Sequence, residues 1–176
     1  IDSDDLWTED KLLKVNKCII ENKKFNCILH RQFHKTKKRK YNKFNFDKYY
    51  DPKKPIHRQI FTSNFLSTST VTIRKELIFN AGLFNEEYQN AQDYDLWLKI
   101  GNNLNIEILK EYLGTYVSRD GNISSRSYLS RIPNVLKIIN KNKKKVSSTL
   151  YIYKLIRIFF SLEWIKLHHF SIKKFF

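Results

Sequence analysis

Residues 68–100 read TSTVTIRKELIFNAGLFNEEYQNAQDYDLWLKI, and this stretch decides the fold class of the chain. Its first part, together with the preceding serine, is rich in β-branched residues and predicts a strand over residues 67–74. The segment KELIFNAG then predicts a short helix closed by Gly82. An apolar stripe at helical spacing in AQDYDLWLKIG predicts a second helix that ends at Gly101. A strand followed closely by helices indicates an α/β protein.

The flanking sequence continues this mixture of strands and helices. Upstream, Thr8 is a good N-cap for a helix over residues 8–22, and residues 26–31 predict a strand. Residues 35–56 are polar, basic and aromatic, and predict a long loop or an excursion from the fold. Downstream, the segments IEIL and YLGTYVS predict two strands, and from about Tyr128 onward the pattern is helical.

The composition is that of one basic domain of 176 residues. With 33 Lys and Arg against 17 Asp and Glu, the net charge is +16, while 41% hydrophobic residues exclude simple disorder. Cys18 and Cys27 do not make a disulfide framework, and no signal peptide opens the chain, so a cytoplasmic location is expected. The chain begins at Ile1 and contains no Met, which indicates a piece of a longer protein.

Five acids open this basic chain: Asp2, Asp4, Asp5, Glu9 and Asp10. Glu9 and Asp10 fit the first turn of the predicted helix, where the helix dipole favours negative charge. Asp2 and Asp4 lie outside that turn, and an extended chain points both carboxylates to one side. Such a pair suits Mg²⁺ or Mn²⁺, which bind substrate phosphates through one or two carboxylates. A helix N-terminus, a metal site and chance are the alternatives for these acids.

Two further segments carry candidate chemistry. In AQDYDLW, Asp93 is either a capping or first-turn residue, or a general base at a helix entrance, which needs reach and a tuned pKa. In YVSRDGNIS, the pair formed by Asp120 and Gly121 predicts a turn.

Taken together and in this order, DSDDLWTEDKL, the 68–100 stretch and YLGTYVSRDGNIS resemble the family 2 glycosyltransferases, over residues 1–125. Those GT-A-fold enzymes carry a DxD motif, a G-x-F-[DN]-E segment, an [EQ]-D-Y-D-L-W helix and a closing Y-R-x-H-x-x-N-I-S strand. The resemblance implies an α/β, Rossmann-related mixed sheet whose amino-terminal, nucleotide-binding half is missing, so that the chain alone is expected to be inactive. Residues 1–127 would be the carboxyl-terminal part of the GT-A domain, and residues 128–176 a basic, helical extension.

The resemblance also implies roles for individual residues. Asp2 and Asp4 match the DxD carboxylates, which bind the donor and hold Mn²⁺ or Mg²⁺ on the diphosphate of a nucleotide-sugar. Asp93 matches the general base that takes the proton from an acceptor hydroxyl during one inverting displacement. Gln92 stands beside it, where many members have Glu, on the acceptor side. Trp97, one turn later, is expected either to wall the acceptor site or to be a core residue.

Two positions depart from the family pattern. Arg119 stands where the family has His, and Val117 where it has Arg. Since a guanidinium offers no lone pair to a metal, Arg119 is expected to bind the donor diphosphate directly.

The implied function is transfer of a hexosyl-type sugar from a nucleotide-sugar donor to a glycan or lipid-linked acceptor in cell-surface polysaccharide synthesis. The competing interpretation is a non-catalytic basic module that binds RNA or an anionic membrane. Residues 34–50 have the composition of a single-strand binder, but no nucleic-acid motif accompanies them, so nucleic acid is not the expected partner. Residues 150–176 predict either a cationic amphipathic helix at the inner face of the membrane or a helix packed on the domain.

Overall fold

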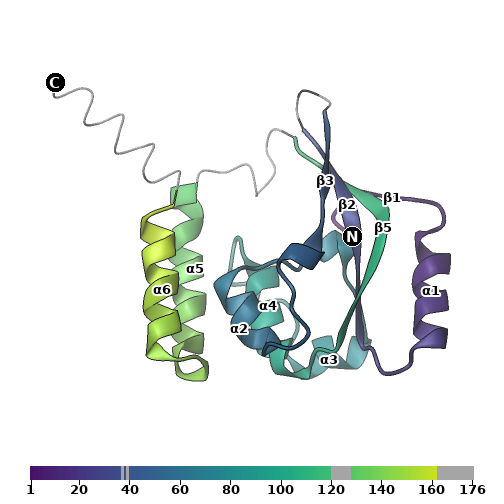
Figure 1. Ribbon diagram of the computed structural model, residues 1–176. Helices are drawn as coiled ribbons and strands as arrows, with labels where there is room; N and C mark the ends of the chain where they lie inside the picture. Colours follow the sequence, from purple (N-terminus) through teal and green to yellow (C-terminus); the bar gives the residue numbers. More distant parts are fainter. Residues whose placement is uncertain (37, 39, 120–127, 162–176) are drawn as a thin grey trace.

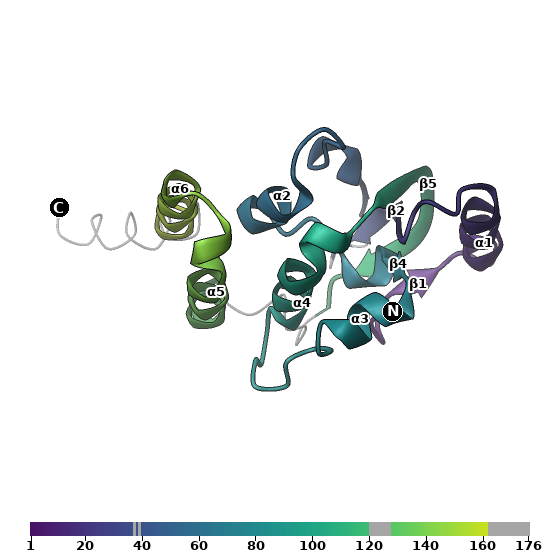
Figure 2. The ribbon, with the colours of Figure 1, turned by 90° about the horizontal axis from the view of Figure 1, so that it is seen from below.

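The computed structural model describes residues 1–36, 38, 40–119 and 128–161, and this part of the chain is an α/β protein. A mixed sheet stands between helix α1 (Lys11–Glu21) on one face and the other helices on the opposite face (Figure 1). Figure 2 shows the same layers from below, with α5 (Tyr128–Asn142) and α6 (Ser148–Phe159) forming the outermost pair.

Strand β2 (Cys27–Lys35) is the centre of the sheet, and it has three neighbours. It pairs in parallel with β5 (Ile106–Val117), and antiparallel with β3 (Tyr41–Phe44) and with the short β4 (Thr72–Ile73). Strand β1 (Leu6–Trp7) extends the sheet by pairing antiparallel with β5. The predicted mixture of strands and helices is therefore confirmed, as a mixed and partly parallel sheet.

The main core lies between the sheet and helices α2 (Ile56–Thr62) and α4 (Gln92–Ile100). Helix α4 begins and ends as the sequence predicts, with Gly101 at its carboxyl end. Helices α5 and α6 contribute Ile138, Ile139 and Ile158 to the same core. The described part of residues 128–176 therefore shares its packing with the rest of the protein.

Helix α1 covers the other face of the sheet through Val15 and Cys18, and it begins later than predicted. The Thr8 backbone N–H donates to the Leu113 carbonyl at 3.1 Å, which keeps Thr8 tied to β5. Its hydroxyl donates to Asp10 Oδ1 at 2.6 Å and caps no backbone N–H. The predicted cap at Thr8 is wrong, and the acids before Lys11 lie outside the first turn.

Three other boundaries differ from the prediction. Residues 35–56 are not one loop, because β3 pairs with β2 and a 3₁₀ turn follows at Phe46–Lys48. The segments IEIL and YLGTYVS form one strand, β5, because register shifts opposite Arg31 absorb the irregularity between them. In residues 67–74 only β4 pairs as a strand, because the Thr70 hydroxyl and N–H both donate to the Ser67 carbonyl and close a turn before it.

The short helix α3 (Lys75–Asn80) is followed by Gly82 at φ +83°, as the sequence predicts for a left-handed residue after a helix. Across the described ranges, none of the helices has the length and apolar character needed to cross a membrane.

Gly114 is required where β1 and β5 approach each other over the buried His30. A Cβ atom at this position would lie 3.0 Å from His30 Cε1 and 3.1 Å from the Leu6 carbonyl oxygen. We predict that Gly114→Ala lowers the free energy of unfolding by about 1–3 kcal/mol, because the added methyl group would press on the buried His30 ring and on the Leu6 carbonyl oxygen. Chemical denaturation measures this, with Lys110→Ala on the exposed side of β5 as the control. Equal stability of the two variants would contradict the packing described.

Candidate functional site

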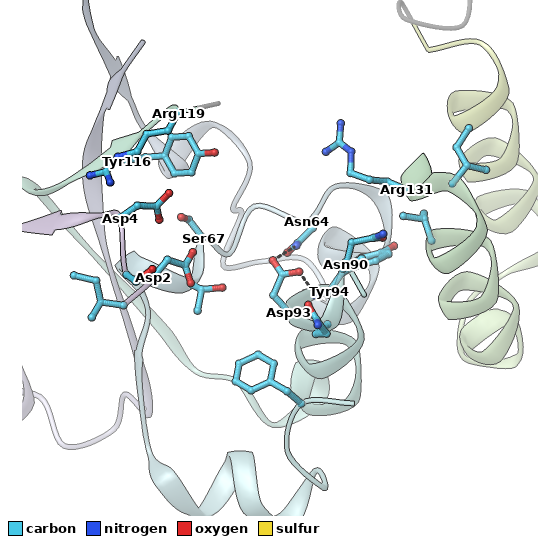
Figure 3. A pocket seen from close by; sticks show the side chains of 18 of the residues that line it. Asp2, Asp4, Asn64, Ser67, Asn90, Asp93, Tyr94, Tyr116, Arg119 and Arg131 are labelled. Atoms are coloured by element: carbon cyan, nitrogen blue, oxygen red, sulfur yellow. Dashed lines mark hydrogen bonds between the residues drawn. The ribbon is translucent and has the colours of Figure 1, made fainter. Parts of the chain in front are cut away.

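One cavity of about 1220 Å³ collects the segments that the sequence singled out. The amino-terminal acids, the start of α4 and the end of β5 all line it (Figure 3). Of the six residues predicted to form the site, five lie in its lining: Asp2, Asp4, Gln92, Asp93 and Arg119. The sixth, Trp97, does not.

The pairing of β1 with β5 explains how residues more than a hundred positions apart meet there. Leu6 pairs with Thr115 in antiparallel register, so the residues before β1 lie beside the residues after β5. Asp5, only 6% exposed, fixes this end of the sheet because its Oδ1 accepts a hydrogen bond from the Val117 N–H at 3.0 Å. The Asp2 N–H donates to Ser69 Oγ at 3.0 Å and holds the chain against the turn before β4.

Asp2 and Asp4 present two carboxylates to the cavity. Burial, followed by the negative charges of Asp5 and Asp4, raises the pKa of Asp2. This crowding of like charges is what a bound cation would relieve, and oxygen ligands are those that Mg²⁺ and Mn²⁺ prefer. Among the described residues, no group of three or more His, Cys, Asp or Glu side chains could hold a metal ion. An ion shared between two carboxylates and a substrate phosphate needs only the pair that is present.

Asp93 lies at the start of α4 with its carboxylate held from two sides. Asn64 Nδ2 donates to Asp93 Oδ2 at 3.0 Å, and the Tyr94 N–H donates to Oδ1 at 2.7 Å (Figure 3). Ala91, in the left-handed region at φ 61°, turns the chain into the helix just before these residues.

The surroundings of Asp93 raise its pKa. Burial is the main cause and the charge of Asp2 adds to it, while the hydrogen bonds from Tyr94 and Asn64 oppose the shift. An oriented, half-buried carboxylate with a raised pKa has the properties of a general base. Asn64, which positions it, was missed from the sequence because no pattern connects it to Asp93.

The other two conspicuous residues of α4 have structural roles. Asp95 is fully buried and pairs with Lys99 Nζ at 2.7 Å, one turn later. Trp97 is 2% exposed, and its Nε1 donates to the Leu66 carbonyl at 3.1 Å. Trp97 is therefore a core residue, which was the alternative to its place in the acceptor wall.

Two cations from the carboxyl-terminal helices also line the cavity: Arg131 of α5 and Lys154 of α6. The sequence offered no signal for them, because they are two among 33 basic residues and only the docking of α5 and α6 brings them to the site. The turn predicted at Asp120 and Gly121, and the tail from residue 162 onward, lie outside the described residues.

A comparison with the sequence models of known protein families gives no match, and no curated protein matches this chain. The function must therefore be inferred from the residues that line the cavity.

The raised pKa of Asp93 predicts that its ionised form destabilises the fold. A carboxyl whose pKa is higher in the folded state lowers the stability as the pH rises through that pKa. When the pH is above the pKa of Asp93 in the folded protein, we expect Asp93→Asn to unfold at the same temperature as the wild type, or at a temperature up to about 4 °C higher. The difference should shrink as the pH falls, since both side chains are then neutral.

Thermal unfolding over a pH series checks this, with the exposed Glu86→Gln as the control. A clear loss of stability in Asp93→Asn but not in Glu86→Gln would mean that the Asp93 carboxylate mainly caps helix α4.

Proposed function

We propose that this chain belongs to an inverting glycosyltransferase, which moves a sugar from a nucleotide-sugar to an acceptor hydroxyl. The observation that carries the proposal is that one cavity holds the oriented, pKa-raised Asp93 together with the acid pair Asp2 and Asp4. In this proposal the sheet is the carboxyl-terminal part of a GT-A-like fold, and the base and ribose of the donor bind to a part of that fold outside this sequence.

The donor side of the cavity would be the end at which β1 meets β5. Asp2 and Asp4 would hold Mg²⁺ or Mn²⁺, whose chemistry is to offset the negative charge that builds up on the departing nucleoside diphosphate. Arg119, in the same part of the lining, places a guanidinium where it can donate to the diphosphate oxygens. These residues bind the leaving group and orient the anomeric carbon toward Asp93.

The acceptor side would begin at Asp93. Its carboxylate takes the proton of the acceptor hydroxyl while that oxygen bonds to the anomeric carbon and the bond to the diphosphate breaks. Because the attack comes from the side opposite the leaving group, the configuration inverts. Asn64 keeps the carboxylate oriented, and Gln92, beside it in the lining, can hydrogen-bond the acceptor.

Replacing the base tests the proposal. We expect Asp93→Asn, made in the full product of the natural gene, to lower the turnover number by about 10²–10⁴-fold, because a general base contributes that much. The affinity for the nucleotide-sugar should stay unchanged, because Asp93 does not hold the donor. Release of nucleoside diphosphate measures turnover, and calorimetry measures the affinity. Glu21→Gln, at an exposed position of α1 outside the motif segments, should keep full activity. A turnover number for Asp93→Asn within about tenfold of wild type would refute the assignment.

We also propose that α6 lies on an anionic membrane surface, which suits a lipid-linked acceptor. Large apolar side chains at helical spacing are exposed along α6: Ile152, Tyr153, Ile156, Phe159 and Phe160. The exposed Lys143–Lys145 turn lies just before this helix, and the whole chain carries a charge of +16. An apolar face flanked by cations is typical of a helix that binds the headgroup region of anionic lipids.

Sedimentation with vesicles checks the membrane proposal. We expect the protein to sediment with phosphatidylglycerol-containing vesicles, and Ile152→Ser/Ile156→Ser/Phe159→Ser to weaken this binding about tenfold, because apolar burial is lost. The matched control is Leu12→Ser/Leu13→Ser/Ile20→Ser, which removes three apolar side chains from α1 that are more exposed than those of α6. If both triple variants bind as well as the wild type, α6 is not the contact.

A further inference from the structure

The wall of the cavity formed by α5 and α6 combines positive charge with apolar surface. Arg131 and Lys154 provide the charge, and Ile132, Val135 and Ile158 provide the apolar part. In the view of Figure 3, Arg131 lies on the side opposite Asp2 and Asp4, with Asp93 between them. We refer to these five residues as the cationic wall.

Lys154 carries a charge that no described acid balances. Its Nζ donates to the Thr62 carbonyl at 3.0 Å and lies 5.2 Å from the centre of the Tyr94 ring. Arg157 donates to the same carbonyl at 3.2 Å, so two cations share one neutral acceptor. Thr62 ends helix α2, and the dipole of that helix favours a cation at this end. One cation, Arg157, would satisfy this preference, so the dipole does not explain why Lys154 is also present and lines the cavity.

The electrostatics of this wall favour an added anion. Burial, followed by the charge of Arg157, lowers the pKa of Lys154 to about 8. A negative group beside the ammonium would offset both effects, and it would gain charge-assisted hydrogen bonds from Lys154 and Arg131. The apolar side chains in the same wall lower its polarity, and a less polar surrounding strengthens such bonds.

The direction of the acceptor follows from the proposed function, on which this inference rests. If the donor diphosphate lies at Asp2 and Asp4 and the reacting hydroxyl lies at Asp93, the rest of the acceptor extends away from the donor. We propose that Arg131 and Lys154 bind an anionic group, a phosphate or a carboxylate, that the acceptor carries beside its reacting hydroxyl. Ile132, Val135 and Ile158 then contact the carbon skeleton attached to that group.

Three probes that share an octyl chain test the anion site and separate its two sources: octyl phosphate, octyl glucuronide and octyl glucoside. We expect the full product of the natural gene to bind one of the two anionic probes at least about tenfold more tightly than the neutral one, because charge-assisted bonds are the strong ones. The tighter of the two identifies phosphate or carboxylate as the group. Calorimetry below the micelle concentration of each probe gives the affinities.

Variants of matched charge locate the binding. Arg131→Gln/Lys154→Gln should abolish the preference for the anionic probe. Lys137→Gln/Lys141→Gln removes the same amount of charge from exposed positions of α5, and this variant should still prefer the anionic probe. No preference in the wild type, or equal loss in both double variants, would overturn the inference.

Donor binding, measured with nucleotide-sugars and Mn²⁺ in the same proteins, separates this inference from the proposed function. Asp2→Asn/Asp4→Asn should weaken donor binding, and Arg131→Gln/Lys154→Gln should leave it unchanged. If Arg131→Gln/Lys154→Gln weakens donor binding as much as probe binding, the cationic wall holds the donor, and the inference fails while the proposed function stands. If the wild type binds no nucleotide-sugar of a panel, the proposed function fails, and with it the acceptor role of the wall.

Discussion

The antiparallel pairing of β1 with β5 is the constraint on which the site depends. Two strand residues, Leu6 and Trp7, are enough to place the acids before them beside the end of a strand more than a hundred residues away. Asp5 stabilises this arrangement by accepting a hydrogen bond from the Val117 N–H. One acid of the cluster therefore has a structural role, while Asp2 and Asp4 face the cavity. The hydrogen bond between the buried Asp5 carboxylate and the backbone of β5 stabilises this end of the sheet, so the carboxylates of Asp2 and Asp4 are not needed for that purpose.

Adjacent turns of helix α4 have different roles, one in the cavity and one in the core. Its first turn presents Asp93 to the cavity, and its later turns bury Trp97 in the core, where the indole N–H is bonded to Leu66. The anchored indole fixes the rotation of the helix, and this rotation aims the carboxylate. The strained Ala91 before the helix and the amide of Asn64, in the segment after α2, complete the support of the Asp93 carboxylate.

The sequence predicted the elements whose signals are local. Helix α4 and the glycine after α3 were predicted because an apolar period and a left-handed residue mark them. The cap at Thr8 was wrong because a hydrogen bond to the Leu113 carbonyl, far along the chain, ties Thr8 to β5. The three motif segments were expected in one site, and described residues from each of them line one cavity. Asn64, Arg131 and Lys154 join this cavity through tertiary packing that no local pattern encodes.

The division of the cavity between two stretches of chain has an evolutionary consequence. Residues 1–119 supply both acid groups of the site, and the α5–α6 hairpin supplies the opposite wall. Substitutions on the inner face of that hairpin can therefore change which molecule is accepted without altering the residues assigned to the chemistry. Ile138 and Ile139, which join the hairpin to the common core, would have to be kept. Diversity among related chains should accordingly collect on the hairpin positions that face the cavity, between conserved anchors.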